Sequence, residues 1–216
     1  SPGGSVVGAE STFVAITELS KQKPSVSVLG ETATSGGYLI AVATDHIISR
    51  ANTITGSIGV ILQYPNLSKL LNNIGVDINT LRSSDLKASF NFFEKPTAKA
   101  IAEQKQVIQE TFSWFKEIVA EKRKLTGIDL EKVSQGGIFT GRTARKLGLV
   151  DLIGGEKEAL KYLEEKINIK GLPVIDWVSH KESSTLFDKI FFEGDLTNLG
   201  KNFLSNSGFK LYSILF

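Results

Sequence analysis

The sequence predicts an α/β fold with a mostly parallel β-sheet. Short segments with strand patterns alternate with segments of helical periodicity, and the connections between them are short, which is typical of stacked βαβ units. The 216 residues correspond to one domain, or to one domain with an appendage. A hydrophobic share of 41% is that of an ordinary globular chain.

Alternating or β-branched runs predict the strands. Residues 25–29 alternate polar and apolar side chains, and a turn over residues 31–35 follows. Residues 46–48 form a short apolar run before another turn. Residues 56–61 are β-branched and interrupted by glycine, which favours a strand that another backbone approaches closely. Residues 76–81 alternate cleanly and predict a fourth strand.

Apolar residues at three- and four-residue spacing, or in short buried runs, predict the helices. In order, these cover residues 8–21, 36–44, 67–74, 97–125, 129–133 and 156–166. Pro96 and Thr97 open the longest helix and Gly127 follows its end. Residues 82–95 are predicted to form a polar loop, and residues 136–141 a turn into a further helix.

Composition excludes several classes of protein. A net charge of +2 is too balanced for a nucleic-acid binder. The absence of cysteine excludes a disulfide scaffold, a thiolate metal site and a cysteine nucleophile. No apolar run approaches the roughly 20 residues that span a bilayer. Because the chain lacks methionine and starts at Ser1, we expect it to be trimmed, processed or cut from a longer protein.

Ser35 is the best candidate for a nucleophile. It lies at a predicted strand-to-helix junction and is followed by Gly36 and Gly37, which permit close approach of a substrate. At the first turn of a helix, free backbone N–H groups surround such a serine, so the Gly36 N–H is a candidate oxyanion donor. The alternative is that Ser35 only caps the helix, a position that serine favours.

The partner base is harder to find from local patterns. The two histidines are His46, in a predicted strand, and His180, in a weakly patterned tail. A G-x-S-x-G nucleophile elbow is absent, since Ala33 occupies its first position. Lys87 is the best remaining base because it stands among apolar residues, where burial would lower its pKa. A surface lysine that covers its neighbours with its methylenes remains the alternative.

Several short motifs occur in a recognisable order. They are Ser1-Pro2-Gly3-Gly4, Ser35-Gly36-Gly37-Tyr38, Thr55-Gly56-Ser57-Ile58-Gly59-Val60, Lys87, Phe139-Thr140-Gly141 with Ala144, and Gly148-Leu149-Val150-Asp151. In this order and spacing, the chain resembles the signal peptide peptidase A family of serine proteases from residue 1 to about residue 165. The step of 52 residues from Ser35 to Lys87 is similar to that of the family's serine–lysine dyad.

The resemblance implies a role for each matching residue. Ser35 would be the nucleophile, Lys87 the general base and then the general acid, and Ser57 the residue that orients Lys87. The implied oxyanion donors are Gly36, Gly3 and Gly4. No metal or cofactor is implied. Asp45 and Asp151 are interpreted as turn or capping residues.

The resemblance also implies the Clp protease and crotonase-like superfold, in which ββα units stack around a parallel sheet. Residues 1–166 would form the catalytic domain, which we expect to begin upstream of Ser1, and residues 167–216 a C-terminal extension that could contact other subunits. The Clp protease has a histidine about 25 residues after its serine; position 60 here is Val60, so that triad is absent.

The implied function is a serine endopeptidase that degrades signal-peptide remnants and other extended apolar peptides. Expected partners are such peptides and further copies of the chain in a ring or dome, but no nucleic acid. The expected location is the bacterial inner membrane, facing the periplasm or extracytoplasmic side, with a membrane anchor upstream of this chain. The alternatives are a sibling protease with quality-control or phage-head substrates, a crotonase-like acyl-CoA enzyme, and a non-catalytic oligomeric scaffold.

Overall fold

The computed structural model describes residues 1–175 and 212–214. The chain divides into two compact units, Ser1–Lys170 with Leu211–Phe216 and Gly171–Lys210. The first unit contains every helix and strand discussed below. The predicted boundary at residue 166 stays a prediction, because most of the proposed extension lies outside the described residues, and His180 lies there as well.

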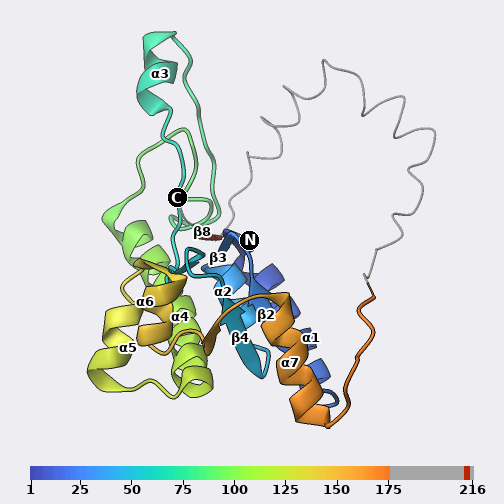
Figure 1. Cartoon of the computed structure of the whole chain (residues 1–216). Coiled ribbons are helices and arrows are strands. Elements are labelled where there is room, and N and C mark those ends of the chain that lie inside the picture. Colours follow the sequence, from blue (N-terminus) through green and yellow to red (C-terminus); the bar gives the residue numbers. More distant parts are fainter. Residues whose placement is uncertain (176–211, 215–216) are drawn as a thin grey trace, which may run out of the picture. The chain divides into compact units, whose positions relative to one another are not determined.

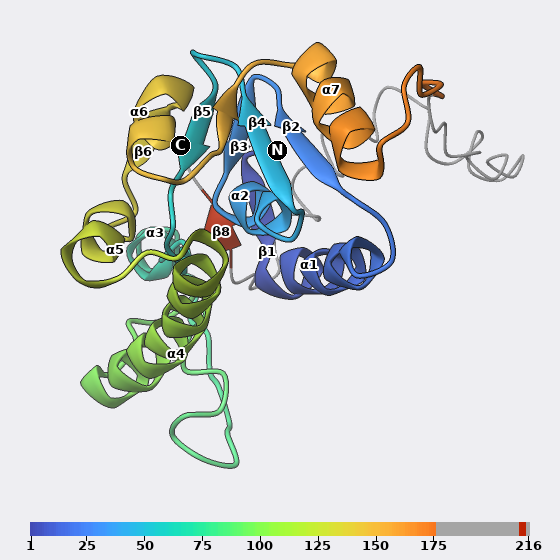
Figure 2. The same ribbon diagram turned by 60° about the horizontal axis from the view of Figure 1, so that its bottom comes forward.

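Three small sheets carry the described strands. The first has the order β2 (Val26–Leu29), β4 (His46–Ser49) and β7 (Leu152–Ile153), all parallel. In the second, β3 (Thr32–Thr34) is parallel to β5 (Ile54–Gly56), which pairs antiparallel with β6 (Ile138–Thr140). The third is the antiparallel pair of β1 (Gly3–Ser5) and β8 (Tyr212–Ile214) (Figure 2). The predicted α/β class with mainly parallel pairing around the core is confirmed.

Seven helices lie in the part of the chain that the structure describes. They are α1 (Val6–Ser20), α2 (Gly36–Ala41), α3 (Ser68–Asn73), α4 (Ala98–Arg123), α5 (Gly127–Val133), α6 (Gly141–Lys146) and α7 (Glu156–Ile167) (Figure 1). Side-chain oxygens of Ser5, Thr97 and Thr140 accept backbone N–H groups at the starts of α1, α4 and α6. Every predicted helix is therefore present, with ends shifted by a few residues. None of the described helices is long and apolar enough to cross a bilayer.

Helix α2 is the centre of the core. Five of its six residues, Gly36 to Leu39 and Ala41, are buried, and Tyr38 is completely enclosed. The helix packs against α1, β1, β3 and α4. Only the C-terminal half of α4 joins this core: Phe115 and Val119 are buried, whereas Ile101 near its start is 38% exposed. A buried helix of this kind places the chain just before it, including Ser35, in the interior.

The strand predictions were less accurate than the helix predictions. Residues 31–35, predicted as a turn, contain β3, and the strand predicted at residues 56–61 lies at Ile54–Gly56 instead. The short strands β6 and β7 were missed. Residues 76–81 form no strand: Val76, Ile78 and Leu81 are exposed, and no neighbouring strand pairs with them among the described residues. Alternating polar and apolar residues form a strand only where a neighbouring strand can pair with them.

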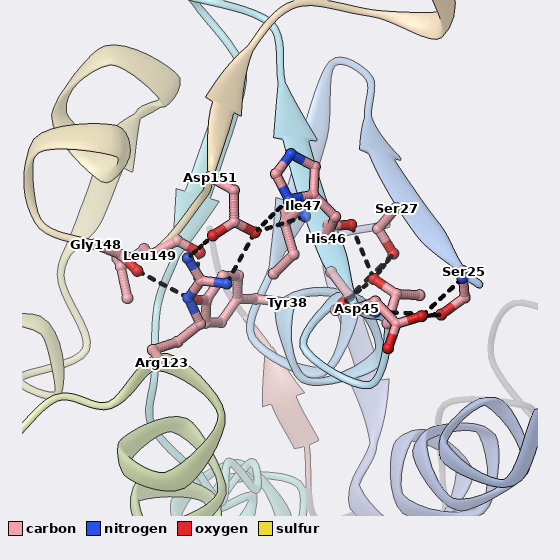
Figure 3. Close-up of polar contacts among 12 residues, drawn as sticks. Ser25, Ser27, Tyr38, Asp45, His46, Ile47, Arg123, Gly148, Leu149 and Asp151 are labelled. Carbon is pink, nitrogen blue, oxygen red and sulfur yellow. Dashed lines mark hydrogen bonds and ion pairs between the residues drawn. The ribbon is translucent and has the colours of Figure 1, made fainter. Parts of the chain in front are cut away.

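A partly buried ion pair joins three parts of the fold, as Figure 3 shows. Arg123, at the end of α4, donates to both carboxylate oxygens of Asp151 (3.0 and 2.6 Å) and, through Nε, to the Gly148 carbonyl (2.8 Å). Asp151 also accepts the Ile47 N–H of β4 (2.8 Å). The interpretation of Asp151 as a turn or capping residue was therefore incomplete, because its carboxylate links α4, β4 and the start of β7.

The neighbours of this ion pair complete a polar network. Burial raises the pKa of the Tyr38 hydroxyl, which donates to the Leu149 carbonyl (2.8 Å). Burial by itself raises the pKa of Asp151, but the hydrogen bonds from Arg123 and Ile47, together with the Arg123 charge, outweigh burial and lower it. His46 Nδ1 lies 3.6 Å from Asp151 Oδ2, and the His46 ring stacks on the Tyr162 ring with centroids 4.2 Å apart.

We predict that Asp151→Asn destabilises the protein by about 2 kcal/mol, between the values for exposed and for fully buried pairs, because it leaves the partly buried Arg123 guanidinium without a counter-charge. The folded-state pKa of Asp151 is lowered, so its stabilisation is complete above the unfolded pKa of about 3.9 and is lost as pH falls through the folded value. Urea unfolding of wild type and variant should therefore differ most near neutral pH and converge in acid.

Asp129→Asn is the matched control, because Asp129 pairs with Lys132 on the surface and both side chains are more than half exposed. It should leave stability nearly unchanged at every pH. Equal effects of the two substitutions, or a gap between wild type and Asp151→Asn that stays constant into acid, would contradict the role of the Arg123–Asp151 pair.

Candidate active site

Ser35 occupies a strained backbone conformation between β3 and α2. Its φ of 54° and ψ of −120° lie in a region that residues with a side chain rarely adopt. The Ser35 N–H donates to the Gly56 carbonyl at the end of β5 (2.8 Å), and the Ser35 carbonyl accepts the Leu39 N–H (2.9 Å). Strain of this kind, which costs of order 1–3 kcal/mol, persists only where the surroundings impose it.

The Ser35 hydroxyl is buried and unpaired. The residue is 1% exposed, and its Oγ has no hydrogen-bond partner within the described residues. Ser35 stands at the N-cap position of α2, but its side chain makes no capping hydrogen bond. The alternative that it serves only as a helix cap therefore has no support. A buried hydroxyl without a partner is costly and requires another explanation.

Residues 1 and 2 lie directly beside Ser35. The Ser1 amino group donates to the Thr32 carbonyl (2.7 Å), and the Thr34 N–H donates to the Ser1 carbonyl (3.1 Å), in the pattern of a parallel strand pair. The Thr34 hydroxyl donates to the Pro2 carbonyl (3.1 Å). A Cβ atom on Gly37 would lie 2.7 Å from the Ser1 carbonyl oxygen, so glycine is required where these segments meet.

The backbone N–H groups of the three predicted oxyanion donors differ in their hydrogen bonding. Gly36 is buried at the start of α2, and its N–H has no acceptor among residues that the structure describes. The Gly3 N–H donates to Ser1 Oγ (3.2 Å). Gly4 belongs to β1, opposite Ser213 of β8. The Gly36 N–H therefore has no competing acceptor, and the oxyanion roles of Gly36, Gly3 and Gly4 all stay predictions.

Ser57 directly follows Gly56, whose carbonyl accepts the Ser35 N–H. It is 5% exposed, has a φ of 52°, and donates its N–H to the Gly137 carbonyl (2.8 Å). It lines a cavity of about 520 Å³ together with segments 59–61 and 134–136 and the α4 residues Ile108, Gln109 and Phe112. The sequence analysis did not identify these α4 residues as part of the site, because their place in the same cavity as Ser57 depends on tertiary packing.

Lys87 does not meet either serine within one chain. It is exposed in a turn of the segment between α3 and α4, where its N–H donates to the Ser84 carbonyl (3.0 Å). Its Nζ makes no hydrogen bond or ion pair to Ser35, to Ser57 or to any other residue in the described ranges 1–175 and 212–214. The apolar burial expected from the sequence is not present in the single chain, and the dyad stays a prediction.

The two remaining candidates from the sequence have structural positions. His46 is a β4 residue that contacts Asp151 and Tyr162, and none of its interactions involves Ser35. Asp45 accepts the N–H and the hydroxyl of Ser25 (2.8 and 3.1 Å), which anchors the start of β2. Neither residue interacts with Ser35, so a Ser–His–Asp arrangement is not formed by them.

A comparison with family models decides the classification. The model described as "Peptidase family S49" matches residues 17–170, most of the chain and nearly all of the first unit. The chain belongs to peptidase family S49. The predicted resemblance is thereby confirmed at the level of the family.

Individual relatives agree with this S49 assignment. A Methanocaldococcus jannaschii protein is 31% identical over 194 residues, covering 90% of this chain and 62% of that protein. The Arabidopsis thaliana protein named "Serine protease SPPA, chloroplastic" is 31% identical over 170 residues, covering 78% of this chain and 25% of that protein. The S49 chain thus spans from a quarter to about three fifths of the length of these relatives.

Among solved structures, the S49 chain is similar to a mutant of the 1510-N membrane-bound stomatin-specific protease. The TM-score is 0.39 at 17% identity, over 69% of this chain and 60% of that chain. The fold assignment accordingly rests on the strand pairing and on the family match.

We predict that Ser35→Ala leaves the fold intact and raises the free energy of unfolding by about 1 kcal/mol, because it removes a buried hydroxyl without a partner. Ser49→Ala is the matched control: Ser49 is equally buried, but its hydroxyl donates to the Arg50 carbonyl (3.0 Å). Thermal or urea unfolding should show the control destabilised by about 1 kcal/mol. Equal losses in both variants would mean that Ser35 Oγ has a partner in solution.

Proposed function

We propose that the protein is a serine endopeptidase in which Ser35 is the nucleophile and Lys87 the general base. The observation that carries the proposal is Ser35 itself: a strained, buried serine whose Oγ is unpaired and lies beside the free N–H of Gly36. A nucleophile must be free of competing hydrogen bonds, and the developing oxyanion needs N–H donors.

In the proposed mechanism, neutral Lys87 takes the proton of Ser35 Oγ while the oxygen attacks the carbonyl carbon of a peptide bond. The Gly36 N–H, together with N–H groups of the Gly3–Gly4 loop, stabilises the oxyanion. Lys87 then donates its proton to the leaving amine as the C–N bond breaks. A water molecule then gives a proton to Lys87 and attacks the acyl carbon, and Lys87 returns that proton to Ser35 Oγ as the ester bond breaks. Ser57, adjacent to the carbonyl that anchors Ser35, orients the lysine amine.

The proposal requires a second copy of the chain to supply Lys87. The exposed lysine has no partner within its own described chain, and α3 together with the segment that carries the lysine exposes large apolar side chains, including Leu70, Ile74 and Leu81. Association that buries these side chains would also bring Lys87 into an apolar environment, which lowers a lysine pKa. This supports a homo-oligomer, for which a ring or dome is the proposed form.

The proposed substrates are extended apolar peptides such as signal-peptide remnants. The cavity beside Ser57 supports this choice, because Ile61, Ile108 and Phe112 give it an apolar wall. The proposed location is a membrane surface, with the anchor in a part of the protein outside this chain. Quality-control or phage-head substrates are the alternative within the same family.

We predict that Ser35→Ala and Lys87→Ala each lower the rate of peptide hydrolysis by about a thousandfold or more, with circular dichroism unchanged. Lys95→Ala is the matched control, since Lys95 is an exposed lysine of the same segment. It should keep wild-type activity against a dye-labelled apolar peptide. Full activity of Ser35→Ala or Lys87→Ala would falsify the dyad.

We further predict that mixing the two inactive variants restores activity. If the lysine acts on the serine of a neighbouring copy, a site with both groups forms whenever a Lys87→Ala chain offers its serine to a Ser35→Ala chain. Random mixing gives about a quarter of the wild-type rate. A mixture that stays inactive after dissociation and reassembly, with oligomers seen by light scattering, would show that both groups of a site come from one chain.

A further inference from the structure

Thr55 of β5 makes a side-chain hydrogen bond to the strand that leads into Ser35. The Thr55 side chain is fully buried, and its hydroxyl donates to the Ala33 carbonyl of β3 (2.6 Å). Ala33 lies opposite Thr55 in the parallel β3–β5 pair, so this bond adds to the backbone hydrogen bonds that pair the two strands. Neither the hydrophobic core nor the proposed mechanism accounts for a buried hydroxyl at this position.

The residues after Thr55 are fixed from the other side of β5. A Cβ atom on Gly56, whose φ is 88°, would lie 2.7 Å from the Phe139 ring, so β6 packs directly against the Gly56 backbone. The Ser57 N–H donates to the Gly137 carbonyl (2.8 Å). Strand β5 is therefore held between β3 and β6, and its last residue supplies the carbonyl that accepts the Ser35 N–H.

The strained backbone of Ser35 has to be held on both sides. After Ser35, its carbonyl accepts the Leu39 N–H in the first turn of α2 (2.9 Å). Before Ser35, the hydroxyl of Thr55 holds the Ala33 carbonyl, two residues upstream. Without this bond the end of β3 is free to shift, and Ser35 can relax toward a common backbone conformation. A shift of about 1 Å in a reacting group costs up to about a hundredfold in rate.

We propose that Thr55 is a positioning residue: by fixing the Ala33 carbonyl, its hydroxyl keeps Ser35 in the conformation that leaves Ser35 Oγ unpaired. The inference rests on the proposed peptidase function and adds a residue to it. Thr55 makes no hydrogen bond to Ser35 Oγ, so it acts only through the backbone of β3. Its loss should slow the chemical step and leave substrate binding unchanged, because the hydroxyl is buried away from any substrate.

The test uses the full chain with Thr55→Val, which replaces the hydroxyl by a methyl group of similar size. Thr53→Val is the matched control: Thr53 directly precedes β5 and is 2% exposed, but its hydroxyl donates to the carbonyls of residues 29 and 30 at the end of β2. Both changes remove a buried hydroxyl bonded to a backbone carbonyl, so urea unfolding should show similar losses of stability. Thr55→Ser is the rescue variant, because it keeps the hydroxyl.

With a dye-labelled apolar peptide, Thr55→Val should lower kcat by about tenfold or more with KM unchanged, while Thr53→Val and Thr55→Ser keep the wild-type kcat. Equal kcat values in the two valine variants overturn the proposal, because the effect would then be one of general stability. Thr55→Ser keeps the hydrogen bond and is expected to fold even if Thr55→Val does not. A tenfold loss of kcat in Thr55→Ser overturns the proposal by itself.

A second measurement does not depend on catalysis. Hydrogen exchange of the Ser35 amide, which donates to the Gly56 carbonyl, reports how firmly the turn is held. Exchange should be about tenfold faster in Thr55→Val than in Thr53→Val, the factor expected for kcat, and equal rates in the two variants overturn the proposal. If the wild-type protein lacks peptidase activity, the proposed function fails, while exchange still decides whether Thr55 holds Ser35.

Discussion

The backbone of Ser35 is the constraint on which the rest of the site depends. Its φ of 54° and ψ of −120° are unfavourable for serine, so neighbouring groups must hold them. The Gly56 carbonyl accepts the Ser35 N–H, the buried helix α2 continues from it, and Ser1 and Pro2 hold the preceding Thr34. The conformation turns the hydroxyl away from the capping position and leaves it without a partner. The fold therefore holds a strained serine with an unpaired hydroxyl at the expense of local stability.

Polar interactions, as well as the hydrophobic core, stabilise the elements around Ser35 and α2. Tyr38, three residues after Ser35, is enclosed and bonded to the Leu149 carbonyl, and the adjoining Arg123–Asp151 pair connects α4 to β4 and to the start of β7. These links are long-range in sequence and converge under α2. A change in the pair would therefore affect the position of the helix whose N-terminus begins beside Ser35, although no hydrogen bond joins the pair to Ser35.

Local sequence patterns predicted the helices and the candidate nucleophile, because helical periodicity and the Ser35-Gly36-Gly37 junction are local properties. The short strands β3, β6 and β7 were missed, since two or three residues carry too little alternation and owe their pairing to distant partners. The same limit applies to Asp151, which meets Arg123 across 28 residues, and to the α4 wall of the cavity. Lys87 was expected in an apolar environment that its own chain does not provide.

The acyl-CoA enzyme and the non-catalytic scaffold differ from the peptidase in one property, the reactivity of Ser35. Treatment of the native protein with a fluorophosphonate probe, followed by peptide mass spectrometry, measures it directly. The account predicts a single phosphonylated residue, Ser35, with labelling abolished in Ser35→Ala and strongly reduced in Lys87→Ala. An unlabelled Ser35 in correctly assembled protein, or a label on a different serine, would contradict it.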